Sequence, residues 1–200
     1  MSLLEDVPAE TLRERSIPVL ETERLVLRAP RPEDAKAVAM LANDRRIAEN
    51  LLRVPHPYRL ADAEAFIASV NRSETDAIFL ATLPDDTIIG SCGVDYRERI
   101  GYELGYWFAV PYWGNGYATE AARAVLDHAF TTLGCDALAS GARVSNPASR
   151  RVLEKCGFQW TGVGLYRIPS IKSSAPVDRF RLDRGLWASL KSWGRARHVA

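Results

Sequence analysis

The chain has 200 residues, of which 47% are hydrophobic and 26% charged, a composition typical of one folded globular domain. Its 26 Lys and Arg residues nearly balance 25 Asp and Glu residues, and a net charge of +1 argues against nucleic acid or an anionic membrane as a partner. Three scattered cysteines, no signal peptide and no run of about 18 apolar residues predict a cytoplasmic protein without a disulfide scaffold, a metal site or a membrane span.

The first half of the chain predicts an extension, one strand and two helices. Residues 1–19 form the extension, with a short helix around Ala9–Arg15. The segment ERLVLRAP alternates apolar and polar residues and ends at Pro30, as a strand does. Helical spacing of apolar residues follows in RPEDAKAVAMLAND and ADAEAFIASVN, with an irregular stretch around RVPHPYRL between them.

The second half predicts strands interleaved with two helices. Strand patterns bounded by turn residues occur at 77–84, 87–96, 102–110, 137–144, 158–168 and 177–183. A long helix ends at Leu133 before Gly134, and a shorter one covers residues 147–156. This order predicts a mixed sheet flanked by helices, an α/β domain over residues 20–190 with a basic tail at 191–200.

The segment YWGNGYATEAARAVL, residues 112–126, places two glycines directly before an amphipathic helix. The preceding strand at 102–110 is almost uninterruptedly apolar, which predicts burial on both of its faces. Free N–H groups in a first helical turn bind anions, and glycines let a phosphate approach the backbone. The segment has neither the P-loop nor the GxGxxG spacing, so it is either a tight turn or a phosphate cradle of another kind.

Four segments resemble, in order, signatures of the GNAT superfamily of N-acyltransferases, in its RimJ/RimL-type branch of ribosomal-protein N-terminal acetyltransferases. They are LETERLVLRAPRPEDA, YELGYWFAVPYWGNGYATEA, VSNPASRRVLEKCGF and DRFRLDRGLW. In the family's pyrophosphate-loop pattern, Gln/Arg-x-x-Gly-x-Gly/Ala, Trp113 takes the first position, Gly116 the glycine and Ala118 the last. The resemblance implies the GNAT fold, a mixed and mostly antiparallel sheet that splays open where the pantetheine arm inserts, with acetyl-CoA as cosubstrate.

The resemblance also implies which residues bind acetyl-CoA. The end of the strand before the loop is expected to bulge, to bind the pantetheine amides through its backbone and to offer one N–H to the oxyanion. Asn146, a natural helix N-cap before Pro147, is expected against the cofactor arm. The cofactor-binding residues predicted in this way are Phe108, Ala109, Val110, Trp113, Gly114, Asn115, Gly116, Tyr117, Ala118, Thr119 and Asn146.

Glu103 and Ser149 are the candidate catalytic residues. Glu103 is the only charged residue between Arg99 and Glu120, and we expect it to act as general base, directly or through a water. A carboxylate near the start of a strand is equally suited to solvation or to pairing with an arginine. The tyrosine acid of many family members is replaced by Leu153. The branch's pattern offers Ser149 as a partner for the thiol, although an inward serine also bonds backbone carbonyls.

The resemblance implies an N-acetyltransferase that moves an acetyl group from acetyl-CoA to a primary amine by direct attack in a ternary complex. The amine is a protein N-terminus or a small molecule, and the loops at 50–58 and 168–177 are expected to set that choice. The alternative is a non-catalytic acyl-CoA-binding module, a sensor or partner, which has no need of the Glu103 carboxylate. The sequence is compatible with a monomer or a homodimer.

Overall fold

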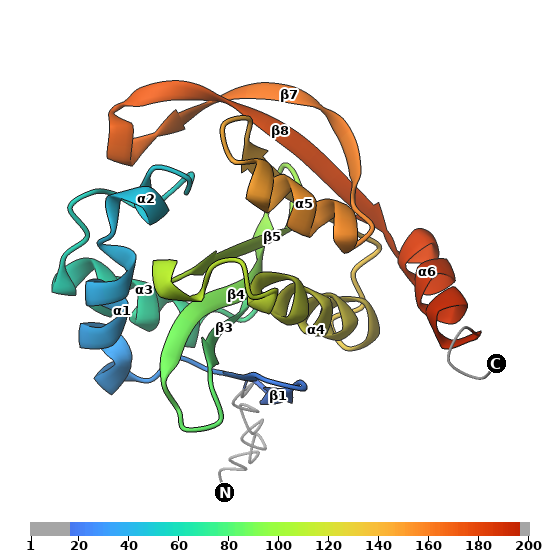
Figure 1. Ribbon diagram of the computed structural model, residues 1–200, viewed down its shortest axis with the longest axis horizontal. Coiled ribbons are helices and arrows are strands. Elements are labelled where there is room, and N and C mark those ends of the chain that lie inside the picture. The colour runs from blue at the N-terminus through green and yellow to red at the C-terminus, as the bar shows by residue number, and fades with distance from the viewer. Residues whose placement is uncertain (1–16, 197–200) are drawn as a thin grey trace, which may run out of the picture.

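The computed structural model describes residues 17–196, and Figure 1 shows how they are arranged. The short helix predicted around Ala9–Arg15 and the end of the predicted tail, residues 197–200, lie outside the described residues. Over the described range the chain forms one open sheet with helices against it, as the sequence predicts.

Eight strands form this sheet in the order β1-β2-β3-β4-β5-β6-β8-β7. Neighbouring strands are antiparallel except β5 and β6, which are parallel. The strands are β1 (Leu20–Glu21), β2 (Val26–Arg28), β3 (Ala77–Thr82), β4 (Ile88–Arg97), β5 (Gly101–Phe108), β6 (Ala137–Arg143), β7 (Gln159–Ile168) and β8 (Ser173–Asp183). The sheet is therefore mixed and mostly antiparallel, which confirms the predicted fold class.

Helices cover both faces of the sheet. They are α1 (Ala35–Ala42), α2 (Arg45–Ala48), α3 (Leu60–Arg72), α4 (Tyr117–Thr131), α5 (Pro147–Lys155) and α6 (Arg184–Ala196), with the 3-10 turns η1 (Pro32–Asp34), η2 (Val110–Tyr112) and η3 (Pro169–Ile171). On one face, α1 and α3 form a buried cluster against which Trp107 packs. On the other face, α4 and α5 share a larger core with Leu104 and Phe108. Successive side chains of β5 thus belong to opposite faces, as strand alternation requires.

The composition of α4 lets it lie close to the sheet. The helix ends at Thr131 with Thr132 as its C-cap, two residues before the predicted end at Leu133. Gly134 follows with a φ of 71°, and the N–H of Cys135 donates to the carbonyl of Ala129 at 3.1 Å. Small and medium apolar side chains line its inner face and are at most 1% exposed: Ala121, Ala122, Val125, Leu126 and Ala129. Their size brings the helix axis, and with it the helix N-terminus, near the end of β5.

β5 and β6 separate soon after they meet. They share only two residue pairs, the second being Glu103 with Ala139. Beyond that point β4 is the only described strand that pairs with β5, although the Ser140 hydroxyl of β6 still donates to the Leu104 carbonyl at 2.9 Å. The predicted burial of residues 102–110 on both faces is therefore wrong. Gly105 is exposed and most of β5 is only half-buried, because β6 has left its flank. This separation is the splay that the resemblance implies.

The helix α6 is not predicted by the sequence, and the predicted boundary at residue 190 lies inside it. Trp187 stacks on Phe130 of α4 with ring centroids 5.1 Å apart. Its indole N–H donates to Asp127 at 3.1 Å, and the Lys191 Nζ lies 2.5 Å from the other oxygen of that carboxylate. The helix follows β8 directly, so no turn residues mark its start. The short helix α2 and the two-residue strand β1 were also not predicted.

A buried ion pair ties β2 to the first helical turn. The Arg28 Nη1 lies 2.7 Å from Asp34 Oδ2, and both residues are 6% exposed. Burial alone would raise the pKa of Asp34, but hydrogen bonds from Arg28 and from the N–H of Arg31 outweigh it and lower that pKa. Asp86 accepts a further bond from Arg28 at 2.7 Å. The pair therefore stays charged and fixes the entry into α1.

Candidate active site

The N-terminus of α4 presents a row of free backbone donors. Gly114 and Gly116 adopt φ values of 80° and 83°, a left-handed conformation that favours glycine. The N–H groups of Thr119 and Glu120 turn back to the carbonyl of Gly116, at 3.0 and 3.1 Å. Over the range that the structure describes, the N–H groups of residues 114–118 have no hydrogen-bond acceptor. These donors carry the partial positive charge of the helix end, so they suit a phosphate group.

The loop also has room for such a group. A Cβ atom built on Gly114 would meet nothing within 4 Å, and one on Gly116 would meet only the Arg24 Nη2, at 3.5 Å. An open groove of about 760 Å³ leads away from Gly116, and its lining includes Arg123 and Lys155. The conformation, the free donors and the open space around the two glycines fit a phosphate group, while the groove beyond them is lined by charges of both signs, including Glu21, Glu23 and Asp127.

Arg24 organises this loop, although the sequence gives no sign of it. Its Nη2 lies 2.6 Å from Glu120 Oε2, and its Nη1 donates to the carbonyl of Asn115 at 3.0 Å. The guanidinium also lies over the Tyr117 ring, 4.6 Å from its centroid. Burial alone would raise the pKa of Glu120, but bonds from Thr22 and Arg24 lower it. A negative charge thus stands in the first turn of α4, and Arg24 neutralises it.

Trp113 holds the loop to the end of β5. Its indole Nε1 donates to the carbonyl of Phe108 at 2.6 Å. Pairing between β4 and β5 runs without a register shift up to Phe108, so the expected bulge in that strand is absent. The chain instead leaves the sheet at Ala109, whose N–H donates to Ile89 at 2.8 Å and whose carbonyl accepts from Tyr112 at 2.9 Å. The Ala109 N–H is therefore not available to a ligand. The next N–H along the chain, that of Val110, has no hydrogen-bond acceptor among the described residues.

Ser149 meets a partner that the sequence reasoning missed. Its Oγ lies 2.9 Å from the hydroxyl of Tyr106, which also donates to the Ser149 carbonyl at 3.1 Å. Burial raises the pKa of Tyr106 well above its ordinary value, so the phenol stays protonated. Asn146 caps α5 by accepting the Ser149 N–H at 3.1 Å, which confirms its predicted capping role. Strand alternation could have signalled Tyr106, since it shares the inward face of β5 with Leu104 and Phe108.

Glu103 lies on the opposite face of β5 and is ion-paired. The Arg53 Nη1 lies 3.1 Å from Glu103 Oε2, and its Nη2 lies 3.1 Å from Asp95 Oδ2. Asp95 is the cross-strand partner of Glu103, is 6% exposed, and also pairs with Arg97. Two neighbouring carboxylates thus share one guanidinium. The alternative of pairing with an arginine is observed, yet the Glu103 side chain keeps 15% of its surface exposed.

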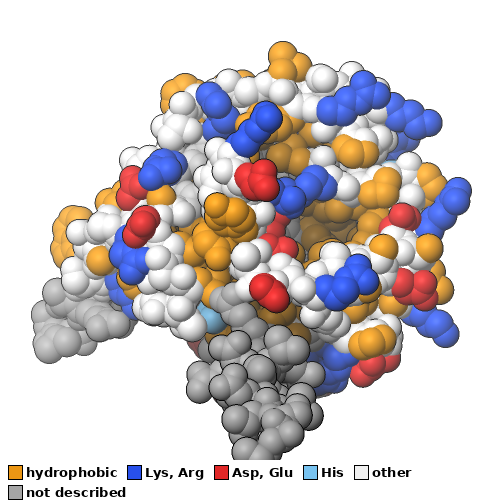
Figure 2. Space-filling model, turned by 180° about the vertical axis from the view of Figure 1, so that it is seen from behind, with side chains coloured by type: hydrophobic (Ala, Val, Ile, Leu, Met, Phe, Trp, Pro, Cys, Tyr) orange, Lys and Arg blue, Asp and Glu red, His pale blue; other side chains and the backbone are white. Residues whose placement is uncertain are grey.

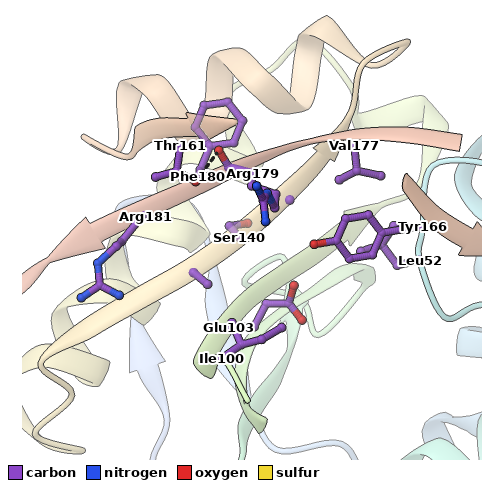
Figure 3. Close-up of a pocket in the computed structure, with 12 residues that line it drawn as sticks. Leu52, Ile100, Glu103, Ser140, Thr161, Tyr166, Val177, Arg179, Phe180 and Arg181 are labelled. Atoms are coloured by element: carbon purple, nitrogen blue, oxygen red, sulfur yellow. Dashed lines mark hydrogen bonds between the residues drawn. The ribbon is translucent and has the colours of Figure 1, made fainter. Parts of the chain in front are cut away.

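That exposed surface faces a cavity. Glu103 lines a cavity of about 270 Å³, together with residues of β6, β7 and β8. Figure 3 shows its carboxylate directed into this space, with the Tyr166 ring and Arg179 across from it. From behind, Figure 2 shows a hollowed face with apolar side chains inside and charged side chains of both signs around it. Glu103 and Ser149 therefore stand on opposite faces of β5, beside the gap that opens between β5 and β6.

Within residues 17–196, no three His, Cys, Asp or Glu side chains gather as they would to hold a metal ion. The cysteines at 92, 135 and 156 are buried and free. In the same part of the chain, every helix is too short or too polar to cross a membrane.

Comparison with known proteins agrees with this geometry. Residues 24–159 match the family described as "Acetyltransferase (GNAT) domain". A Bacillus subtilis (strain 168) protein described as "Putative ribosomal N-acetyltransferase YdaF" is 30% identical over 155 residues, which are 72% of this chain and 84% of that protein. Sequence and fold thus point to the same family.

Two solved structures illustrate the shared fold. The spermidine N-acetyltransferase from Vibrio cholerae, in complex with CoA and spermine, gives a TM-score of 0.71 at 22% identity, over 84% of this chain and 99% of that one. The ribosomal-protein-S5-alanine acetyltransferase from Vibrio fischeri gives 0.72 at 17% identity, over 85% and 98%. At these identities the likeness establishes the fold alone. Together with the family match, it shows that this chain belongs to the GNAT acetyltransferase family.

Proposed function

We propose that the protein is an N-acetyltransferase that transfers the acetyl group of acetyl-CoA to a primary amine by direct attack in a ternary complex. The observation that carries the proposal is the row of free N–H groups at residues 114–118, next to the gap between β5 and β6. A carboxylate in a cavity stands on the other side of the same strand. A cofactor and an acceptor would thus approach β5 from different sides and meet at its open edge.

The cradle supports binding of the cofactor's phosphates. Backbone N–H groups of residues 114–118 would donate to the pyrophosphate, with Trp113 holding the loop in place. Arg123 and Lys155 line the groove behind Gly116 and offer positive charge for a further phosphate. Bound there, acetyl-CoA supplies an acetyl thioester whose thiol is the leaving group.

The remaining roles belong to the chain's own residues. Glu103 accepts a proton from the acceptor's ammonium group, which leaves a neutral amine able to attack. The Val110 N–H is the donor best suited to the negative charge that develops on the carbonyl oxygen, because it is free and lies at the end of β5. When the Tyr106 hydroxyl donates its proton to Ser149 Oγ, the Ser149 hydroxyl proton is free to donate a hydrogen bond toward the leaving sulfur.

The acceptor is a primary amine, on a peptide N-terminus or on a small molecule. The relatives support both sources, since one is described as a ribosomal N-acetyltransferase and a structural neighbour was solved with CoA and spermine. The purified protein with acetyl-CoA should be given a panel of short peptides and small amines, with CoA release followed and products identified by mass spectrometry. Acetylation of an amine supports the enzyme. Tight binding of acetyl-CoA without any acetylated product would support the sensor instead.

A further inference from the structure

The cavity beside Glu103 carries information about the acceptor. Its volume, about 270 Å³, lies near the lower end of small-molecule sites and would admit a small molecule or the first residues of a peptide. Leu52, Ile100 and Val177 provide apolar walls, and the arched β7–β8 hairpin (Figure 1) contributes further residues to its lining. Its polar side chains then decide which amine fits.

The charges around the cavity do not cancel evenly. Glu103 is paired with Arg53, and Arg181 is paired with Asp183, whose Oδ1 lies 2.7 Å from its Nη2. Arg179 also lines the cavity, yet its guanidinium makes no ion pair or hydrogen bond with any residue that the structure describes. Arg179 is solvent-exposed, so one positive charge without a protein partner stands at the open side of the cavity.

The backbone makes room for this guanidinium. Pairing of β7 with β8 shifts register at Gly162, which lies opposite Arg179 and has a φ of 135°. A Cβ atom built on Gly162 would lie only 3.3 Å from Arg179 Nη2, so a larger residue there would crowd it. The Tyr166 hydroxyl faces the same space (Figure 3) and has no partner over the described residues. Two donors are thus held toward the cavity without an acceptor of their own.

We infer that the acceptor is a primary amine that carries a carboxylate, bound by Arg179 while its amine lies at Glu103. The inference rests on the proposed function. A guanidinium presents paired N–H groups that match the two oxygens of a carboxylate, and the Tyr166 hydroxyl adds a donor. A polyamine is disfavoured, because its second ammonium group would face the guanidinium of Arg179 instead of an acidic wall.

The test compares matched acceptors that differ only in this charge. One arm uses alanyl-alanine with a free carboxylate against its C-terminal amide. The other uses amidated hexapeptides with aspartate or asparagine as the second residue. A preference in the first arm indicates a small-molecule acceptor, and a preference in the second indicates a peptide acceptor. Each is measured for kcat/KM by CoA release and for binding by calorimetry, on the wild type and on Arg179→Gln, Arg179→Lys and Arg181→Gln. Circular dichroism melts check that the variants fold.

In at least one arm, the kcat/KM of the wild type should be about tenfold to a hundredfold higher for the acceptor with the carboxylate than for its uncharged match. Arg179→Gln should reduce that ratio to about one, and Arg179→Lys should restore part of it. The ion-paired neighbour, Arg181→Gln, should keep most of it. Equal kcat/KM and equal binding for both partners in both arms would overturn the inference. If no amine is acetylated but carboxylate partners still bind through Arg179, the inference stands and the proposed function fails.

Discussion

The hydroxyl oxygens of Tyr106 and Ser149 lie 2.9 Å apart, so a hydrogen bond joins β5 to α5 beside the gap between β5 and β6. Where Tyr106 is the donor of this bond, the Ser149 proton stays available to a leaving thiol.

Removing the Ser149 hydroxyl should therefore slow turnover. Ser149→Ala should lower kcat by about tenfold to a hundredfold, because the leaving sulfur loses its donor, while the Kd of acetyl-CoA should change little. Tyr106→Phe should give a smaller loss, since it removes only the group that directs Ser149. Rates come from CoA release and Kd from calorimetry. Ser69→Ala on the exposed face of α3 is the control, and an unchanged kcat in Ser149→Ala would refute the assigned role.

Arg24 should strengthen cofactor binding by neutralising Glu120. In Arg24→Gln the Glu120 carboxylate is left beside the phosphates, and we expect the Kd of acetyl-CoA to rise about tenfold at low salt. The double variant Arg24→Gln with Glu120→Gln should recover most of the affinity, because both charges are gone. The difference should shrink at high salt. An equally weak double variant would mean that Arg24 acts by another route.

Gly116 should be indispensable to the cradle. Gly116→Glu adds a side chain and a negative charge where the N–H groups point, and it should abolish measurable acetyl-CoA binding. Gly134→Ala is the matched control, since Gly134 has the same left-handed conformation at the other end of the same helix. Both variants should lose stability, but only Gly116→Glu should lose binding. Micromolar binding by Gly116→Glu would sink the assignment of the phosphate loop.

The buried pair of Arg28 and Asp34 should make the fold sensitive to acid. The pKa of Asp34 is lowered in the folded state, so its contribution is complete above about pH 4 and is lost as pH falls through the lower folded value. Asp34→Asn should cost about 2–4 kcal/mol in free energy of unfolding at pH 7, somewhat less than a fully isolated buried charge because Asp86 remains beside Arg28.

Urea denaturation at pH 7 and pH 3 measures this effect. The loss of stability between the two pH values should be smaller in Asp34→Asn than in the wild type. Asp183→Asn, which breaks an exposed pair, should behave like the wild type. Parallel pH profiles for Asp34→Asn and wild type would show that Asp34 titrates alike in both states.

The sequence predicts the sheet and its main helices because their signals are local. Strand-like segments bounded by turn residues mark β3 to β8, Pro147 begins α5, and Gly134 follows the end of α4. The helix α6 was not predicted because it follows β8 without a turn that would mark its start. Its apolar side chains pack on distant parts of the chain, as Trp187 does on Phe130, and the local sequence does not reveal such contacts. The burial of β5 was predicted wrongly because the residues of β5 do not show where β6 separates from it.

The site was predictable only in part, for the same reason. The glycines of the cradle and the helix behind them form a continuous motif, so their place could be read from the sequence. Arg24 reaches Glu120 from a distant segment, and Arg53 reaches Glu103 in the same way. Such pairs form only when distant strands and loops come together in the fold, so they cannot be predicted from the spacing of residues along the chain.

The central claim, that Glu103 serves acetyl transfer, is tested most directly by Glu103→Gln. The variant keeps the size of the side chain and removes the group that accepts the proton. Turnover of an acetylated amine should fall at least about tenfold, while the Kd of acetyl-CoA stays within about twofold. Glu98→Gln, in the exposed turn before β5, should match the wild type. An unchanged kcat in Glu103→Gln, with the same acceptor and saturating acetyl-CoA, would contradict the account.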